Sequence, residues 1–150
     1  MKKILLPIDG SPRSLRTIQT VKQIYSPDEV EITILSVIGS APRIEEPADE
    51  PVEHPPVDED AEEVADPQAE ENARLLMDSF ARMLPEYKVE IVMRRGSPGP
   101  TIVHFAEEGK FDSILMTRSS RGPMQKLGSV ATYIVRNASF ITTTVLREGL

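Results

Sequence analysis

The residues of this 150-residue chain that could bind a ligand stand where apolar segments end or helices begin. Asp9 follows an apolar run over residues 3–8, and Thr117 closes another run over residues 113–117. Gly128-Ser129 precedes a segment with helical spacing. A helix start offers unpaired backbone N–H groups and the positive end of the helix dipole, so it can hold a phosphate. On spacing alone, an N-cap that only satisfies its own helix is the better interpretation of this dipeptide.

An alternation of strand-like and helix-like segments must position these residues. Short apolar or β-branched runs predict strands at residues 3–8, 30–37, 88–94, 113–117 and 140–146. Apolar residues at helical spacing predict helices at about 12–25, 69–84, 98–109 and 128–138. Ser11 is expected to cap the first helix, with Pro12 at its first position. The alternation predicts an α/β fold, a five-stranded parallel sheet with helices on both faces, whose ligands lie at the carboxyl ends of the strands.

Length and composition narrow the class of protein. The chain is long enough for one domain with a single core. It contains no cysteine, which excludes a disulfide framework, a thiolate metal site and a cysteine nucleophile. Pro7 and Asp9 end the first apolar run well short of a signal-peptide core or a membrane span. We therefore expect a soluble, cytoplasmic protein with no membrane partner.

One acidic segment dominates the net charge of −7. Twelve of the 24 acidic residues lie between Arg43 and Glu70, with one of the 17 basic residues, so the rest of the chain is mildly basic. The part at about 43–67 is rich in proline and has no hydrophobic period, so it cannot bury enough apolar surface to offset its ordering entropy. We predict a mobile insertion there, dispensable for folding, in a single domain of residues 1–150. We expect no nucleic-acid partner, although the argument from acidity applies to this segment only.

Three other groups of polar residues favour ordinary roles. His54 and His104 are isolated in the sequence, so no metal site is predicted, and His104 is expected on a helix surface or half-buried. The carboxylates of residues 58–63 lack the glycine and the ligand spacing of a calcium loop. A basic group consists of Arg94, Arg95, Arg118, Arg121 and Lys126. It could neutralise a nucleotide, contact the acidic insertion or form ordinary surface.

Four stretches, in this order, resemble the universal stress protein family. KKILLPIDGSPRS is similar to the family's first strand and Asp-Gly-Ser turn, and RRGSPGPTIVHFAEEGKFDSILMT to its Gly-x-Pro turn, third helix and fourth strand. GSVATYIVRNA is similar to its nucleotide-loop exit and last helix, and FITTTVL to its final strand. The resemblance implies one universal stress protein domain with a sheet ordered 3-2-1-4-5, in the Rossmann-like, adenine nucleotide alpha hydrolase-like architecture.

The family's nucleotide motif is altered in this chain. Members that bind ATP typically carry Gly-x-x-Gly, nine further residues, and Gly followed by Ser or Thr. Here Thr117 and Ser120 replace the two leading glycines, and seven residues precede Gly128-Ser129. Glycine lets the backbone approach a phosphate closely and adopt positive φ, and the β-branched Thr117 is expected to crowd that approach. The dipeptide at 122–123, Gly-Pro, is an alternative source of the tight turn.

The resemblance also implies a binding role for individual residues. Asp9 would lie near the ribose or the adenine edge, and the base would be lined by Pro7, Val37 and Met116. The phosphates would be surrounded by Thr117, Ser120, Gly128, Ser129 and Val130. Each residue has a structural alternative, since Asp9 could only cap the next helix and the apolar residues could simply be core. The implied ligand is ATP or another adenine nucleotide, with or without Mg²⁺.

Three functions remain open at this point. The leading hypothesis is a stress-response regulatory or binding protein, because no set of nucleophile, base and orienting residue is visible that would make it an enzyme. The second is a nucleotide hydrolase or transferase on the same architecture, which would need a positioned base and for which only Asp9 is an obvious carboxylate. The third is a structural dimer whose nucleotide site has decayed.

The final predicted strand, Phe140 to Leu146, indicates a homodimer. In a sheet ordered 3-2-1-4-5 this strand lies at an edge and leaves backbone donors and acceptors open. Its sequence is β-branched, uncharged and free of proline, so it carries none of the usual features that block edge pairing. We predict antiparallel pairing with the same strand of a second copy about a two-fold axis. The alternative is that the acidic insertion or residues 148–150 cover the edge.

Overall fold

The strand-like and helix-like segments form the elements that they predict. The computed structural model describes residues 1–9, 13–38, 67–117 and 129–146. The elements are β1 Lys2–Ile8, α1 Ser14–Ile24, β2 Val30–Ile38, α3 Pro67–Arg82, β3 Lys88–Arg95, α4 Pro98–Glu108, β4 Ser113–Thr117, α5 Ser129–Asn137 and β5 Thr142–Leu146. The acidic insertion lies outside the described residues except for Pro67, which begins α3.

Most element boundaries differ from the prediction by one or two residues, and the starts of α1 and β5 are two informative cases. Helix α1 begins at Ser14 and not at about residue 12, while Ser11 and Pro12 lie outside the described residues. Strand β5 begins at Thr142 and not at Phe140. The Ile141 N–H still donates to the carbonyl of Ala138 at 3.2 Å, so the chain is turning out of α5 where a strand was expected. Phe140 is accordingly half exposed.

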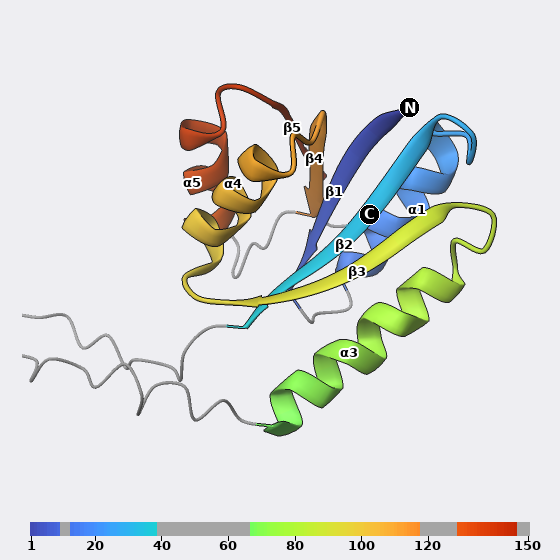
Figure 1. Ribbon diagram of the computed structural model, residues 1–150, viewed down its shortest axis with the longest axis horizontal. Helices are drawn as coiled ribbons and strands as arrows, with labels where there is room; N and C mark the ends of the chain where they lie inside the picture. The colour runs from blue at the N-terminus through green and yellow to red at the C-terminus, as the bar shows by residue number, and fades with distance from the viewer. Residues whose placement is uncertain (10–12, 39–66, 118–128, 147–150) are drawn as a thin grey trace, which may run out of the picture.

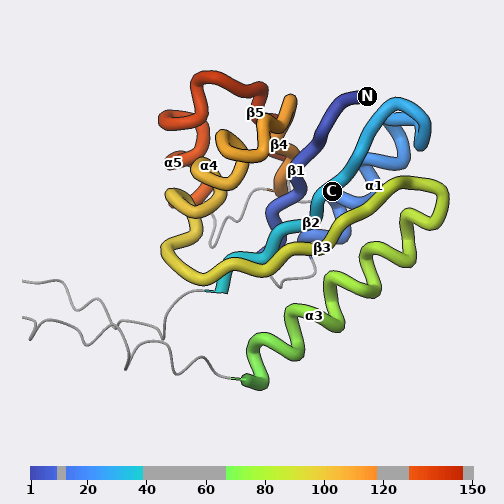
Figure 2. The backbone as a smooth tube through the Cα atoms, viewed as in Figure 1, coloured from blue at the N-terminus to red at the C-terminus, as the bar shows by residue number. Residues whose placement is uncertain are grey.

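The five strands form one parallel sheet in the order β3-β2-β1-β4-β5, which confirms the order that the family resemblance implied. Helices α1 and α3 cover one face of the sheet, and α4 and α5 cover the other (Figure 1). From β3 at one edge, α4 carries the chain across to β4 on the far side of β1 (Figure 2). The strand order therefore reverses between β1 and β4, and such a switch point is where ligands bind in open α/β sheets.

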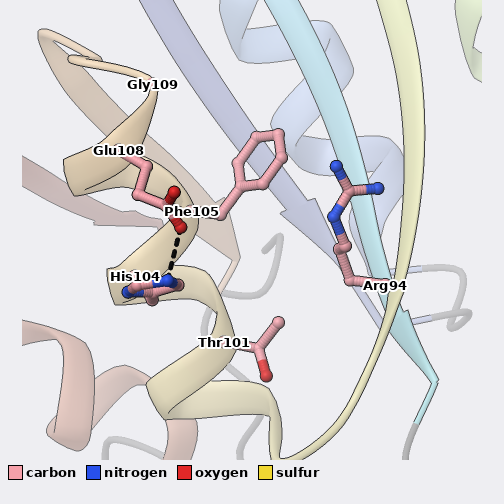
Figure 3. A pocket seen from close by; sticks show the side chains of 6 residues that line it. All are labelled: Arg94, Thr101, His104, Phe105, Glu108 and Gly109. Carbon is pink, nitrogen blue, oxygen red and sulfur yellow. Dashed lines mark ion pairs between the residues drawn. The ribbon is translucent and has the colours of Figure 1, made fainter.

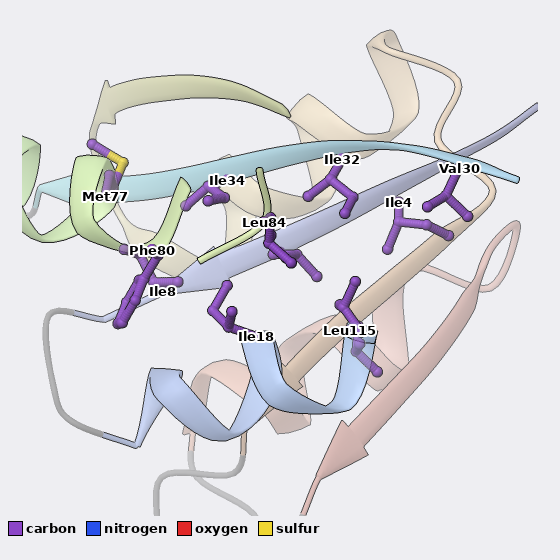
Figure 4. Close-up of a cluster of buried hydrophobic side chains, with 12 residues drawn as sticks. Ile4, Ile8, Ile18, Val30, Ile32, Ile34, Met77, Phe80, Leu84 and Leu115 are labelled. Atoms are coloured by element: carbon purple, nitrogen blue, oxygen red, sulfur yellow. The ribbon is translucent and has the colours of Figure 1, made fainter. Parts of the chain in front are cut away.

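The core explains why β1 is apolar along most of its length. Ile4, Leu6 and Ile8 pack into the cluster under α1 and α3, whereas Leu5 belongs to the cluster under α4 and α5. Figure 4 shows the first of these clusters, in which side chains of α1 and α3 meet those of the sheet. Successive side chains of a strand point to opposite faces, so a strand that is covered on both faces needs a continuous apolar run.

The amino ends of β1 and β4 are joined by several contacts of one lysine. The backbone N–H of Lys3 donates to Asp112 Oδ2 at 2.8 Å, and the Asp112 N–H donates to the Lys3 carbonyl at 2.8 Å. The Lys3 ammonium donates to the Gly109 carbonyl at 2.5 Å and lies 4.7 Å from the centroid of the Phe111 ring. These contacts fix the register of the two strands at the end of the sheet opposite the predicted ligand site.

A tyrosine before β3 predicts a loss of stability in alkali. The Tyr87 hydroxyl donates to the Tyr25 carbonyl at 2.6 Å, and burial, followed by the nearby Glu86 and Glu29, raises the pKa of Tyr87. Because the folded pKa lies above the unfolded one, the stabilisation is fully present below about pH 10 and is lost as the pH rises through the folded pKa. Tyr87→Phe should cost about 1 kcal/mol at neutral pH.

Urea denaturation of wild type and Tyr87→Phe between neutral pH and strong alkali tests this prediction. The difference between their free energies of unfolding should shrink as Tyr87 ionises, because the variant has no hydroxyl to lose a proton. Two profiles that stay parallel through the whole range would show that Tyr87 does not titrate differently in the folded state.

Candidate functional site

A proline in the central strand interrupts the pairing of β1 with β4. The β1–β2 pairing runs over seven residue pairs, whereas the β1–β4 pairing covers Ile4–Ser113 and Leu5–Ile114. Lys3 directs its backbone N–H and C=O toward β4. Because these groups alternate in direction along a strand, the backbone groups of Leu5 and of position 7 also point toward β4. Pro7 has no N–H, so the next ladder bond to β4 cannot form. The strands therefore stop pairing at the switch point of the sheet.

The three residues predicted to line a base share one face of this region. Val37 and Met116 belong to or pack against the core cluster under α4 and α5. Pro7 is buried, and it follows Leu5 of that same cluster by two residues, so the alternation places it on the same face. The structure thus places the three predicted residues on the adjacent strands β2, β1 and β4, facing α4 and α5. These residues also contribute to the core, which is the structural alternative considered for them.

Asp9 interacts with the start of α1. Arg13 Nη2 lies 3.5 Å from Asp9 Oδ2, and the Ser14 hydroxyl donates to Oδ1 at 3.3 Å and lies 3.4 Å from the Asp9 N–H. The side chain of Asp9 remains 49% exposed at the carboxyl end of β1. The alternative weighed for Asp9 was a cap on this helix, but its contacts here are with side chains, and the N-cap residue of α1 is Arg13, without a side-chain cap hydrogen bond. The carboxylate still reaches the surface beside Pro7.

Thr117 directs its side chain to the opposite face from Met116. Its Oγ1 lies 2.5 Å from Oγ1 of Thr17 in α1, and Thr17 is fully buried. Among the described residues other than glycine, only Lys110 has positive φ, so the backbone of Thr117 needs no glycine for its conformation. The β-branched side chain thus points away from the face that carries Pro7, Val37 and Met116.

The beginning of α5 supplies the remaining predicted contacts. Ser129 is exposed in the first turn, and Val130 is half-buried against the cluster under α4 and α5. Ala131 and Ile134 dock the helix on that cluster, at 1% and 0% exposure. Ser120 and Gly128 lie outside the described residues. The described part of the predicted phosphate site is therefore Thr117 together with the helix start at Ser129 and Val130.

A separate groove of about 300 Å³ lies between β3 and α4 and contains none of the predicted nucleotide residues. In it the Arg94 guanidinium lies 5.3 Å from the centroid of the Phe105 ring (Figure 3). The His104 side chain contacts the Glu108 carboxylate at i,i+4 on the exposed side of α4, as expected for a surface histidine. Arg95, another member of the predicted basic group, pairs with Glu70 in the first turn of α3. Two of the basic residues thus have structural contacts at the β3 edge.

Two buried hydroxyls near the strand ends are absent from the sequence prediction. Ser14 and Thr17 are polar residues among the apolar positions Leu15, Ile18 and Val21 of the first helix. A buried hydroxyl requires a hydrogen-bond partner, so polar residues on the inner face of a helix are a signal that could have been used.

In the part of the chain that is described, no three His, Cys, Asp or Glu side chains gather as metal ligands. No helix of that part is long and apolar enough to cross a membrane.

Comparison with known proteins agrees with the sequence pattern. A model of the universal stress protein family matches residues 1–145. A universal stress protein of Methanocaldococcus jannaschii is 29% identical over 141 residues, which are 91% of this chain and 77% of the relative. A universal stress protein in complex with cAMP has a TM-score of 0.65 at 17% identity, over 99% of this chain and 98% of its own. An Arabidopsis thaliana family member with AMP bound has a TM-score of 0.66 at 15% identity, over 99% and 93%.

Proposed function

Because this chain belongs to the universal stress protein family, we propose that it binds an adenine nucleotide, ATP or AMP, and acts as a regulatory protein in the stress response. The observation that carries the proposal is the interruption of β1–β4 pairing at Pro7, with Pro7, Val37 and Met116 on one face beside it. The cAMP and AMP complexes of the two structural relatives support the same class of ligand.

Each part of the nucleotide would meet a different part of the site. The apolar side chains of Pro7, Val37 and Met116 suit the faces of an adenine ring. The half-exposed Asp9 carboxylate can accept hydrogen bonds from ribose hydroxyls or from the adenine amine. The start of α5 at Ser129 offers backbone N–H groups and a positive dipole end to phosphates.

A binding role is preferred over hydrolysis or group transfer. Such chemistry needs a base in reach of the reacting proton. In the described part of the chain, the carboxylate at these strand ends belongs to Asp9. It already contacts the side chains of Arg13 and Ser14. We therefore propose that the protein is not an enzyme. A hydrolase would convert ATP to ADP during incubation with the purified protein, which chromatography of the nucleotide detects.

We further propose that the protein acts as a homodimer through β5. The strand lies at the edge of the sheet, as predicted, and its Thr142 and Thr144 side chains are exposed. Antiparallel pairing of two copies would satisfy the open backbone groups of both edges. The cytoplasmic location stays a prediction of the sequence.

Calorimetry with ATP and AMP tests the nucleotide proposal, together with mass spectrometry of gently purified protein for released nucleotide. Asp9→Ala should weaken ATP binding about tenfold, because a hydrogen bond to a charged group contributes roughly 1.5–3 kcal/mol. Asp28→Ala removes an exposed carboxylate at the opposite end of the sheet and is the matched control, with no expected effect. Absence of heat with millimolar ATP or AMP for wild type would favour the decayed-site alternative.

A further inference from the structure

The carboxyl ends of β1 and β4 have stopped pairing with each other, yet both are bonded to the same helix. Ser14 of α1 contacts Asp9 at the end of β1, and Thr17 contacts Thr117 at the end of β4. Positions three residues apart lie on one face of a helix, so the two hydroxyls stand one turn from each other. Helix α1 thus bridges the two strand ends on the face opposite Pro7, Val37 and Met116.

We propose that Thr17 is a positioning residue of the nucleotide site, which holds the end of β4 in place through the hydroxyl of Thr117. The inference rests on the proposed nucleotide binding and deepens it. The hydrogen bond that the structure gives for the Thr17 side chain is to Thr117, and an effect of Thr17 on a nucleotide would be transmitted through that contact.

The burial of the two hydroxyls gives the contact its strength. Thr17 is 0% exposed and Ser14 is 4% exposed, and the partner of the Thr17 hydroxyl among the described residues is Thr117. A buried hydroxyl without a partner is unfavourable, so Thr17 favours the one arrangement of β4 that brings Thr117 within reach. This matters at the site, because beyond Leu5–Ile114 the end of β4 is no longer paired with β1 and its ladder partner is the edge strand β5 alone.

Because Met116 precedes Thr117 in the strand, the position of Thr117 affects where Met116 stands. Met116 is 7% exposed and lies next to Thr117 in the strand, on the face predicted for the base. Without the contact, the end of β4 would sample more arrangements, and a nucleotide would have to select one of them on binding. The apparent affinity of a ligand falls with the population of the competent arrangement.

A double-mutant cycle in unfolding measures the contact itself. Thr17→Val and Thr117→Val keep the side-chain shape and remove one hydroxyl each. Thr17→Val should lower the equilibrium constant for folding about fivefold. Thr117→Val should lower it more, since it leaves the fully buried Thr17 hydroxyl without a partner. The double variant should lose less than the product of the two single effects. Strictly multiplicative effects would overturn the proposed contact.

Calorimetric titration with ATP, well below the melting temperature of every variant, separates positioning from stability. Thr17→Val should bind ATP about fivefold more weakly than wild type, since one net hydrogen bond is worth about 1 kcal/mol. Thr17→Ser keeps the hydroxyl and should restore wild-type affinity. Thr20→Val is the matched control on the same helix, because the Thr20 hydroxyl donates to the Arg16 carbonyl at 2.8 Å, within α1.

The outcomes distinguish this inference from the nucleotide proposal. Equal ATP affinity of wild type and Thr17→Val would overturn the positioning role and leave nucleotide binding in place. A loss of affinity in Thr20→Val as large as in Thr17→Val would also overturn it, because the effect would then not depend on the strand end. A wild-type protein that binds no adenine nucleotide would remove both proposals.

Discussion

Thr143→Pro is expected to convert the protein from a dimer to a monomer that still folds. Proline removes a backbone N–H, and at this position the lost donor faces the open edge of the sheet and not β4. The hydroxyl of Thr143 is buried without a hydrogen-bond partner among the described residues, so the substitution also removes no side-chain hydrogen bond. Pairing between two β5 strands would lose a donor in each copy.

The register of the sheet shows which way the Thr143 N–H points. In a parallel ladder, only one residue of each partnered pair directs its backbone groups to the other strand. Leu5 directs its groups to β4, as Lys3 does, so its partner Ile114 directs its own groups away from β1 and toward β5. Thr143, the partner of Ile114 in β5, must then face outward, and the neighbouring Thr144 faces β4.

Sedimentation velocity of wild type, Thr143→Pro and Thr144→Pro tests the dimer and its geometry together. Thr143→Pro should sediment as a folded monomer with a circular dichroism spectrum like that of wild type. Thr144→Pro should break the β4–β5 ladder and lower the melting temperature by more. Wild type that sediments as a monomer at micromolar concentrations would contradict the proposed dimer, and a dimeric Thr143→Pro would place the interface elsewhere.

Ile134→Ala is expected to be among the most destabilising single substitutions in α5, at about 2–5 kcal/mol. Ile134 is fully buried, and α5 spans only Ser129–Asn137, so few other side chains hold this helix on the sheet. Loss of this side chain leaves a cavity beneath the helix whose first turn is the predicted phosphate site. ATP affinity should fall as well, because the helix start would no longer be held in one place.

Ile24→Ala is the matched control for this substitution. Ile24 has the same side chain in another helix, but it is 53% exposed, so its truncation should change the free energy of unfolding by no more than about 0.5 kcal/mol. Urea denaturation of both variants measures the difference. Similar losses for the two isoleucines would mean that α5 is not held by the burial seen here.

Most of the fold could be predicted because it depends on local patterns. The apolar run of β1 reflects burial on both faces, and the helical spacing of Met77 and Phe80 reflects their burial against the sheet. The strand order followed from the family resemblance and was confirmed. The start of β5 was less predictable. Ile141 is apolar and β-branched like a strand residue, but its N–H donates to the Ala138 carbonyl in the turn that follows α5.

The site was predictable in its apolar part and not in its polar contacts. Pro7, Val37 and Met116 fall on one face because strand alternation and strand order fix where they point. The contact of Thr17 with Thr117 joins residues 100 positions apart, and no local pattern announces it. The groove at Arg94 and Phe105 likewise depends on how α4 lies against the edge strand, which the spacing of residues does not specify.

The contact between Thr17 and Thr117 also changes how the altered glycine motif should be interpreted. A change of Thr117 to glycine alone would restore the first motif residue, but it would leave the buried Thr17 hydroxyl of α1 without its hydrogen-bond partner. It would therefore be a poor test of the motif. Position 17 would have to become alanine in the same step. In evolutionary terms we expect the two positions to be epistatic, so a chain with threonine at one should be examined for a hydroxyl at the other before its nucleotide motif is judged lost.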